Sequence, residues 1–286
     1  METWKRTVYI SLICVFCTSF GVSQLAPILP LYFHDLGVQT PSAMSLWSGL
    51  ATGATYLIVC LVAPFWGRIA DKKGRKITLI RSSFGMALCN LLLAFQTTPE
   101  GVVIIRLIQG LVNGFYSATI TLIASESPIE RTGWALGLLA SANLAGSLIG
   151  PLLGGYIADT IGIRNGFILV GILMGFAGLL ATIFINENYV PKPNVEKLSI
   201  SKLKEQIPEF NSIVALCIAS FIYAICIMSL QPVISVYIKG IVPSNTENLA
   251  FIAGAVFSAM GIAQLISLTI SGISGAERKR RATEAL

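Results

Sequence analysis

A single arginine inside a long apolar stretch is the residue most able to carry chemistry in this sequence. Arg106 is the only charged residue between positions 101 and 124, and Gln109 and Gly110 follow it closely. At about 1.5 Å per helical residue, Arg106 lies roughly 7 Å from the start of that stretch. A charge at the centre of a membrane helix costs roughly 2.5–3.5 kcal/mol on insertion scales, and the cost is smaller at the depth of Arg106, so it is the adjacent Gln109 and Gly110 that favour a functional role. The alternative is that Arg106 extends outward to the membrane surface.

Groups that gain and lose a proton are scarce in the apolar stretches. No Asp or Glu lies in the middle of one, and the chain has a single histidine. The best candidates for proton transfer are therefore His34 and Asp35, at the end of the first stretch, followed by Asp71. For His34 and Asp35, a solvated surface loop is an equally good interpretation. The six cysteines all lie in apolar stretches, and the sequence shows no nucleophile–base pairing or metal-ligand cluster, so we expect no covalent enzyme, no cofactor and no metal site.

A glycine–aspartate–glycine pattern occurs twice, 88 residues apart. The first copy comprises Gly67, Asp71, Gly74 and Arg75, and the second comprises Gly155, Asp159 and Gly162. The copies follow the second and the fifth apolar stretches, so three stretches form one repeat. Because three is odd, consecutive repeats enter the membrane from opposite sides, which is typical of secondary transporters.

A second glycine-rich pattern lies in the stretch 133–158. Its members are Gly146, Gly150, Pro151, Gly154 and Gly155. Three glycines at four-residue spacing let two membrane helices approach closely, and the proline removes one backbone hydrogen bond and bends the helix. A lone pair of glycines at this spacing is common in membrane helices, whereas the complete pattern is much more specific.

The elements that must position these residues are membrane helices. Hydrophobic residues make up 54% of the chain and charged residues only 12%, whereas an ordinary soluble domain carries roughly 25% charge. Eight stretches are long enough to cross a bilayer core, which takes about 20 residues of helix. They cover residues 7–33, 43–66, 77–96, 101–124, 133–158, 165–186, 211–238 and 247–273. The expected fold class is therefore all-α integral membrane, with the lipid bilayer as a partner.

Basic residues set the expected orientation. With the N-terminus inside, sixteen of the 20 Lys and Arg residues lie in inside segments and two in outside loops. The inner loops of membrane proteins carry this excess, so both termini are expected on the cytoplasmic side of a cell membrane. The net charge of +6 has the same origin, and no nucleic-acid partner is expected.

A polar segment divides the eight stretches into six and two. Residues 1–186 are expected to form an N-terminal six-helix bundle, and residues 187–210 a cytoplasmic linker with a short amphipathic helix. Residues 211–273 are expected to form a partial C-terminal bundle of two helices, followed by a basic cytoplasmic tail over 274–286.

Taken together, these motifs resemble the drug:proton antiporter branch of the major facilitator superfamily, especially bacterial twelve-helix multidrug efflux proteins. The resemblance implies the major facilitator fold and proton-coupled export of small lipophilic or cationic drugs. The glycine pattern of 133–158 resembles the motif found mainly in exporters. Arg106 would take part in proton transfer. A conformational switch and charge relay would comprise Gly67, Asp71, Gly74, Arg75 and Glu126. For Glu126, an acid at a helix end on the membrane surface is the alternative.

Polar residues inside the apolar stretches are the candidates for substrate contact. They are Gln24, Asn113, Tyr116, Asn143 and Gln231. The family lines its central cavity with the first, fourth and seventh helices, which favours all of these except Asn143. The alternative for each residue is a hydrogen bond to a neighbouring helix.

The chain departs from the family in length. Twelve helices are expected and eight stretches are present, so the sequence suggests a truncated gene product or an interrupted reading frame. Two other functions stay open. One is an uptake or metabolite carrier on the same fold, which the glycine pattern disfavours. The other is a non-transporting membrane fragment that binds a ligand or a full-length partner.

Overall fold

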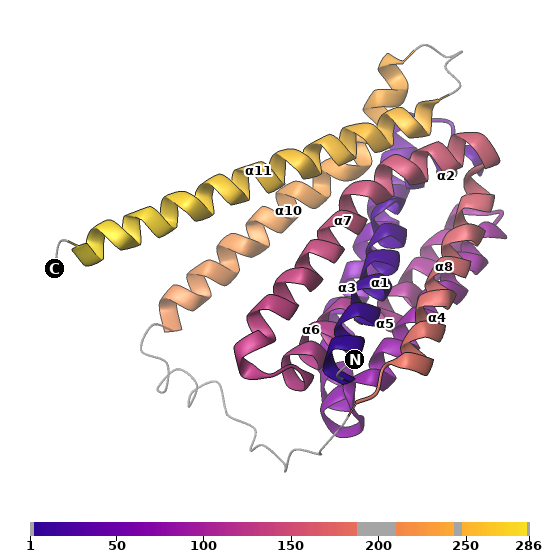
Figure 1. Ribbon diagram of the computed structural model, residues 1–286. Coiled ribbons are helices and arrows are strands. Elements are labelled where there is room, and N and C mark those ends of the chain that lie inside the picture. The colour runs from indigo at the N-terminus through magenta and orange to yellow at the C-terminus, as the bar shows by residue number, and fades with distance from the viewer. Residues whose placement is uncertain (1–2, 188–209, 243–247, 285–286) are drawn as a thin grey trace.

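The computed structural model describes residues 3–187, 210–242 and 248–284, with side chains up to residue 266 in the last segment, and these residues are almost entirely helical (Figure 1). The helices are α1 (Thr3–Ser23), α2 (Leu25–Asp35), α3 (Pro41–Lys73), α4 (Arg75–Ala94), α5 (Pro99–Val112), α6 (Phe115–Glu126), α7 (Ile129–Ile161), α8 (Ile163–Phe184), α10 (Phe210–Ile241) and α11 (Leu249–Glu284). Within these residues, eight helical spans are long and apolar enough to cross a membrane. The all-α, multi-pass membrane fold is therefore confirmed.

Two membrane passes are broken, although the sequence predicted one continuous stretch for each. The first pass is interrupted at Gln24, between α1 and α2, where the backbone stays helical (φ −62°, ψ −23°) but Pro27 has no N–H to donate to the Ser23 carbonyl. The fourth pass breaks between α5 and α6 at Asn113 and Gly114, where Gly114 has a φ of +123°. Glycine adopts such a backbone at little cost, whereas other residues rarely do. The breaks at Gln24 and Asn113 fall at nearly equivalent positions of the two repeats.

The internal repeat is visible in the backbone. Helices α3 and α7 each contain 33 residues, and each ends at the last glycine of the repeated pattern. These glycines, Gly74 and Gly162, both have a φ of +90°, and α4 and α8 begin at the next residue. A helix of this length measures about 50 Å and extends beyond a hydrocarbon core of roughly 30 Å. The two copies therefore build the same helix–glycine–helix joint.

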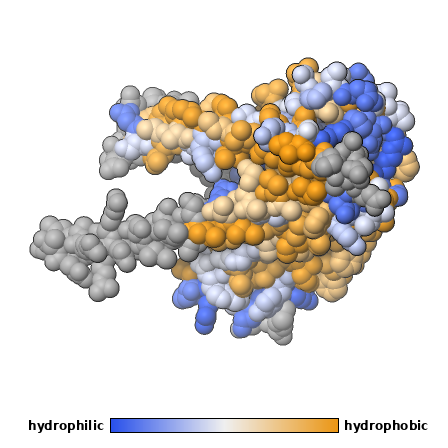
Figure 2. Space-filling view, turned by 90° about the horizontal axis from the view of Figure 1, so that it is seen from above, coloured by the Kyte–Doolittle hydropathy of each residue, from blue (hydrophilic) through white to orange (hydrophobic). Residues whose placement is uncertain are grey.

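The first six passes form a bundle, and the last two pack against one side of it. Helix α1 packs on α7 and α8, α3 on α5, and α4 on α8. Helices α10 and α11 contact α2, α3 and α7, and they lean away from the bundle in Figure 1. The apolar window of α4 is 56% buried, whereas that of α10 is 0% buried. Figure 2, which looks down on the molecule from above, shows hydrophobic side chains along the helices that project from the bundle, and many large hydrophobic side chains of the membrane passes are exposed, as contact with lipid requires.

The predicted linker and the predicted C-terminal tail can be compared with the structure to different extents. The linker predicted over 187–210, with its amphipathic helix, falls almost entirely outside the described residues. The tail predicted over 274–286 was placed beyond the last helix, but α11 continues to Glu284. The sequence after Gly275 contains mainly strong helix formers and no proline, which explains the longer helix.

Candidate functional site

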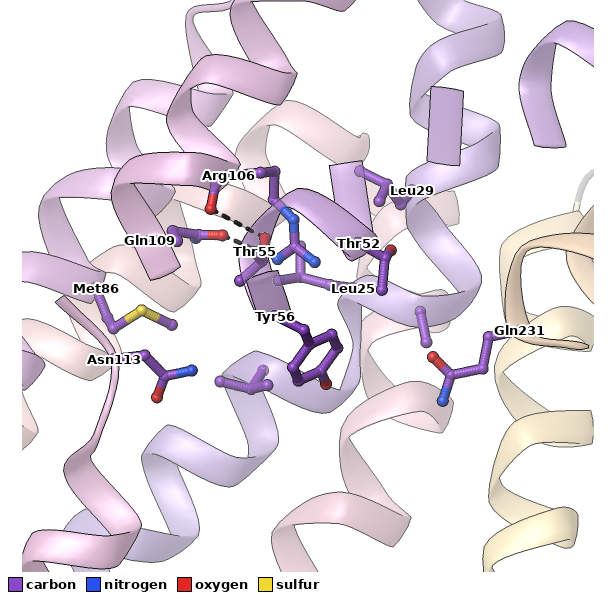
Figure 3. A pocket seen from close by; sticks show the side chains of 12 residues that line it. Leu25, Leu29, Thr52, Thr55, Tyr56, Met86, Arg106, Gln109, Asn113 and Gln231 are labelled. Carbon is purple, nitrogen blue, oxygen red and sulfur yellow. Dashed lines mark hydrogen bonds between the residues drawn. The ribbon is translucent and has the colours of Figure 1, made fainter. Parts of the chain in front are cut away.

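A cavity of about 60 Å³ lies where the two broken passes meet α3, α4 and α10 (Figure 3). Its lining comprises Val22, Leu25, Ala26 and Leu29 of the first pass, Thr52, Thr55 and Tyr56 of α3, Met86 of α4, Arg106, Gln109 and Asn113 of the fourth pass, and Gln231 of α10. Interrupted helices at corresponding positions of inverted repeats are the usual place for transporter binding sites. Because drug-sized pockets measure roughly 300–1,000 Å³, a larger ligand requires the walls of this cavity to move apart.

Arg106 lines this cavity and does not extend to the membrane surface. The residue is 7% exposed, and its Nη1 donates a hydrogen bond to Gln109 Oε1 at 2.9 Å. Among the described residues, neither Arg106 Nε nor Gln109 Nε2 has a hydrogen-bond partner. The structure thus differs from the alternative in which Arg106 reaches outward. A buried guanidinium with donors to spare can bind an acceptor that enters the cavity.

The glycine of the arginine motif brings α5 close to α3. A Cβ atom at Gly110 would lie 2.6 Å from the Thr55 carbonyl oxygen and 2.8 Å from Ile58 Cβ, so a larger residue does not fit. Thr55 Oγ1 also donates to the Arg106 carbonyl at 2.9 Å. These contacts fix the backbone from which the Arg106 side chain extends.

The break in the fourth pass is held by two side chains that the sequence analysis did not single out. Arg81 of α4 donates to the carbonyls of Leu111 and Asn113, at 3.1 Å each. Trp66 of α3 donates from Nε1 to the Leu111 carbonyl at 2.8 Å, and the Arg81 guanidinium lies over its ring at 3.5 Å. These donors satisfy carbonyls at the end of α5 that the break leaves without helical partners. The available signal was a charge, Arg81, inside a predicted membrane stretch.

The structure brings two of the five expected substrate contacts, Asn113 and Gln231, to the cavity. In Figure 3, Gln231 approaches from α10, on the side opposite Asn113 and Met86. Gln24 lies at the first break and is 1% exposed, and neither of its amide atoms has a partner among the described residues. It packs against α7, where a Cβ at Gly154 would lie 2.7 Å from Gln24 Oε1. Gln24 therefore joins the first break to the glycine pattern.

The other two expected contacts, Tyr116 and Asn143, do not line the cavity. Tyr116 packs against a hydrophobic core cluster of the bundle. Asn143 Oδ1 accepts a hydrogen bond from Ser19 Oγ at 2.6 Å, which is the helix-to-helix bond that the sequence left as an alternative. The polar residues that α3 contributes to the cavity were not predicted from the sequence. These are Thr52, Thr55 and Tyr56, whose three- and four-residue spacing marks one helix face.

The first copy of the repeated pattern lies at the opposite end of α3 from His34. Asp71 and Arg75 form an ion pair at 4.0 Å, and the Asp71 side chain is 70% exposed. Arg75 Nη1 lies 3.5 Å from Ser125 Oγ, beside Glu126 at the end of α6. A Cβ at Gly67 would meet no atom of the described residues within 4 Å. The structure therefore gathers the expected relay residues at one end of the bundle.

Glu187 completes this end of the bundle and was not predicted. Its carboxylate accepts the backbone N–H groups of Arg75 and Lys76, at 2.8 Å each. A carboxylate at the start of a helix satisfies free donors and complements the helix dipole. A Cβ at Gly74 would lie 2.6 Å from Glu187 Oε2, so the glycine makes room for this cap.

In the second copy of the pattern, the aspartate of the motif itself caps a helix. Asp159 Oδ1 accepts from the N–H of Ala250 at 3.1 Å, and Oδ2 accepts from the N–H of Phe251 at 2.7 Å. Asp159 thereby caps α11 and joins it to α7. Gly155 lies in the same contact, where a Cβ would be 2.7 Å from the Ala250 carbonyl carbon.

The glycine pattern of α7 packs against two different helices. A Cβ at Gly146 would lie 2.7 Å from the Phe16 carbonyl oxygen, and one at Gly150 would lie 2.6 Å from that of Phe20. These glycines let α7 approach α1, as the spacing predicted. Pro151 lies against α11 instead, where its carbonyl faces Gly254. The pattern therefore joins both the first pass and the eighth pass to α7.

His34 and Asp35 lie at the surface, away from the cavity lining. Their side chains are 37% and 58% exposed, with Nδ1 and Oδ1 separated by 3.8 Å. This position agrees with the alternative of a solvated surface. Within the part of the chain that the structure describes, no three His, Cys, Asp or Glu side chains are grouped to hold a metal ion.

Curated relatives share most of this chain. The multidrug resistance protein MdtG of Proteus mirabilis is 35% identical over 266 residues, and that of Salmonella paratyphi A is 36% identical over 264 residues. The alignments cover 93% and 92% of this chain but 66% and 65% of the relatives. The chain thus spans about two thirds of the length of these relatives.

Solved transporters share the fold. A D-xylose–proton symporter matches with a TM-score of 0.68 and 15% identity, covering 97% of this chain and 70% of that one. An auto-inhibited POT family peptide transporter matches with a TM-score of 0.59 and 16% identity, covering 90% and 51%. The family described as Major Facilitator Superfamily matches residues 11–283. The chain therefore belongs to the major facilitator superfamily.

Proposed function

We propose that this chain acts in the proton-coupled export of small lipophilic compounds across the cell membrane. The observation that carries the proposal is the buried Arg106 in a cavity at two equivalent helix breaks. The multidrug resistance proteins among its relatives favour export over uptake. The glycine pattern on α7, which resembles the exporter motif, supports the same direction.

Energy for export would come from protons moving inward. One proton is worth about 2.3 kcal/mol per 100 mV of membrane potential. We propose that the end of the bundle with Asp71 faces the cytoplasm, because the neighbouring Lys72 and Lys73 follow the positive-inside rule. Both termini would then be cytoplasmic.

The Asp71–Arg75 pair is the proposed switch. At 4.0 Å and with Asp71 70% exposed, the pair is weak and open to water, so a proton can reach the carboxylate. Protonation would remove the charge that holds Arg75 and so loosen the contact to Ser125 beside Glu126. Arg106 would exchange its partner Gln109 for substrate at the other end of the relay. His34 and Asp35 are weaker candidates, because they lie outside the cavity lining and at the opposite end of α3 from the Asp71–Arg75 pair.

Two parts of the chain would move relative to each other. We propose that residues 1–186 form one bundle and that residues 211–273 belong to a second, joined by the linker 187–210 and followed by the tail 274–286. The weak burial of α10 supports this division for that helix, whereas α11 packs closely on α7 through the Asp159 cap, so movement would have to preserve or break that contact. Separation of α10 from α3 would widen the cavity on the side of Gln231.

The experiment is dye efflux from a drug-sensitive host that expresses the chain, with and without a proton uncoupler. We expect uncoupler-sensitive efflux, and we expect Asp71→Asn to abolish most of it. Glu130→Gln, which changes an exposed acid at the same end, is the matched control and should retain efflux. Normal membrane insertion without efflux would contradict the proposal and favour a non-transporting protein. Full efflux by Asp71→Asn would exclude the role given to Asp71.

A further inference from the structure

The charge in the cavity wall is positive and lacks a counterion. Of the described residues that line the cavity, Arg106 alone carries a charge. The side-chain acceptor that Arg106 Nη1 contacts, Gln109 Oε1, is neutral. A buried charge is strongly penalised unless an opposite charge compensates for it. The positive charge of Arg106 is therefore not compensated by the described wall, and an anionic ligand can supply the opposite charge.

Hydrogen-bond donors in the same wall also lack acceptors. Arg106 Nε and Gln109 Nε2 are both buried and without partners among the described residues. Arginine offers only donors, and its fork geometry matches the two oxygens of a carboxylate. Thr52, Tyr56 and Gln231 contribute further polar groups to the lining. A group that accepts several hydrogen bonds and carries negative charge fits this arrangement.

The remainder of the wall suits a hydrocarbon body. Val22, Leu25, Leu29 and Met86 line the cavity beside Arg106. The volume of about 60 Å³ accepts a small head group, while the apolar body requires the walls to separate. A cationic ligand would meet the charge of Arg106 and no carboxylate from the described residues. The wall thus discriminates between ligands that carry opposite charges.

We propose that the ligand bound at Arg106 carries an oxyanion, such as a carboxylate, on an apolar body. This inference rests on the proposed export function and assigns its substrate class. It departs from the cationic drugs that the sequence resemblance implied. Such an anion would bridge Arg106 and the free donor of Gln109, which would take up the donors that now lack partners.

The test uses the purified full chain in nanodiscs of uncharged (zwitterionic) phosphatidylcholine, with protein-free nanodiscs as the blank. The probes are naphthalene-2-carboxylate, naphthalene-2-carboxamide and 2-naphthylmethylammonium, which share one apolar body. Equilibrium dialysis at neutral pH should show the carboxylate binding at least tenfold more tightly than the amide, and the ammonium binding most weakly. Equal affinities, or tighter binding of the ammonium, would overturn the inference without any variant.

Two variants locate the effect. Arg106→Gln should lower the affinity for the carboxylate to that for the amide, with its helix content checked by circular dichroism. Arg131→Gln removes the same charge from an exposed position and should leave all three affinities unchanged. A carboxylate preference that survives in folded Arg106→Gln would contradict the assignment.

The binding test is separable from the test of export. Dialysis needs no proton gradient and therefore measures binding alone. If the chain preferred the carboxylate but exported nothing, the proposed export would be wrong and the proposed ligand class would stand. If the chain exported dyes in an uncoupler-sensitive way but showed no carboxylate preference, only the proposed ligand class would be wrong, and the proposed export would stand.

Discussion

The two copies of the glycine–aspartate–glycine pattern share one backbone but have different surroundings. Gly74 and Gly162 have the same φ of +90°, and each follows a 33-residue helix. Asp159 in the second copy accepts two backbone amides of α11. Asp71 in the first copy pairs with a side chain at 4.0 Å and is 70% exposed. The same sequence motif therefore makes a structural cap in one place and an accessible ion pair in the other.

The first glycine of each copy also differs in how closely other helices pack on it. A Cβ at Gly155 would lie 2.9 Å from Phe251 Cα, whereas one at Gly67 would have no neighbour within 4 Å in the part of the chain that the structure describes. The last glycine of the motif shows the opposite difference. Glu187 lies against Gly74 in the first copy, whereas no described atom lies within 4 Å of a Cβ at Gly162 in the second. The motif thus specifies the turn, and the helix that packs on it decides what the carboxylate does.

The largest expected loss of stability comes from adding a methyl group at Gly155, in the second copy of the pattern. Gly155→Ala places a Cβ against the backbone of α11, and overpacking of this kind typically costs about 1–3 kcal/mol. Gly67→Ala is the matched control at the equivalent position, and its change should stay within about 0.5 kcal/mol. Thermal unfolding of both variants in the same detergent measures the difference. Equal unfolding midpoints would show that the two copies do not differ in packing.

A somewhat smaller effect is expected from the second aspartate. Asp159→Asn replaces one of the two oxygens that accept the first amides of α11, and the loss of one such hydrogen bond costs about 0.5–1.5 kcal/mol. Hydrogen exchange at Ala250 and Phe251 should accelerate, with the amides of α4 unchanged. In Asp71→Asn, by contrast, stability should change by less than about 1 kcal/mol, because exposed ion pairs contribute little. Faster exchange at α4 alone in Asp159→Asn would break the comparison.

The smallest effect concerns Glu187, which caps the first joint from outside the motif. Glu187→Gln keeps one acceptor but removes the interaction of a charge with the α4 dipole, worth about 0.3–1 kcal/mol. The amides of Arg75 and Lys76 should exchange faster, and those of α11 should not. If these amides kept their exchange rates, another group would have to be the cap of α4.

Much of the fold could be predicted because its signals are local. Runs of apolar residues gave all eight passes, and the spacing of Gly146 and Gly150 predicted the close approach of α7 to another helix. The repeated motif predicted two equivalent joints, which Gly74 and Gly162 form. These features depend on hydropathy and small side chains within one stretch, so neighbours in space need not be known.

The candidate site was less predictable because it depends on contacts between stretches. Hydropathy does not register the breaks at Gln24 and Asn113, since the chain stays apolar on both sides. The clamp of Arg81 and Trp66 on the fourth pass joins three consecutive helices through residues that lie 30 and 45 positions from Leu111. Glu187 also lies more than a hundred residues from the amides that it caps.

The central claim is that the Arg106 cavity, between two equivalent breaks, binds the substrate whose export is coupled to protons. The most direct test is proton movement driven by substrate in proteoliposomes that enclose a pH-sensitive dye and start with an acidic lumen. Adding a compound that the chain exports should release protons from the lumen, Arg106→Gln should abolish that release, and Arg131→Gln should preserve it. Substrate accumulation without proton movement, or an unchanged signal in folded Arg106→Gln, would contradict the claim.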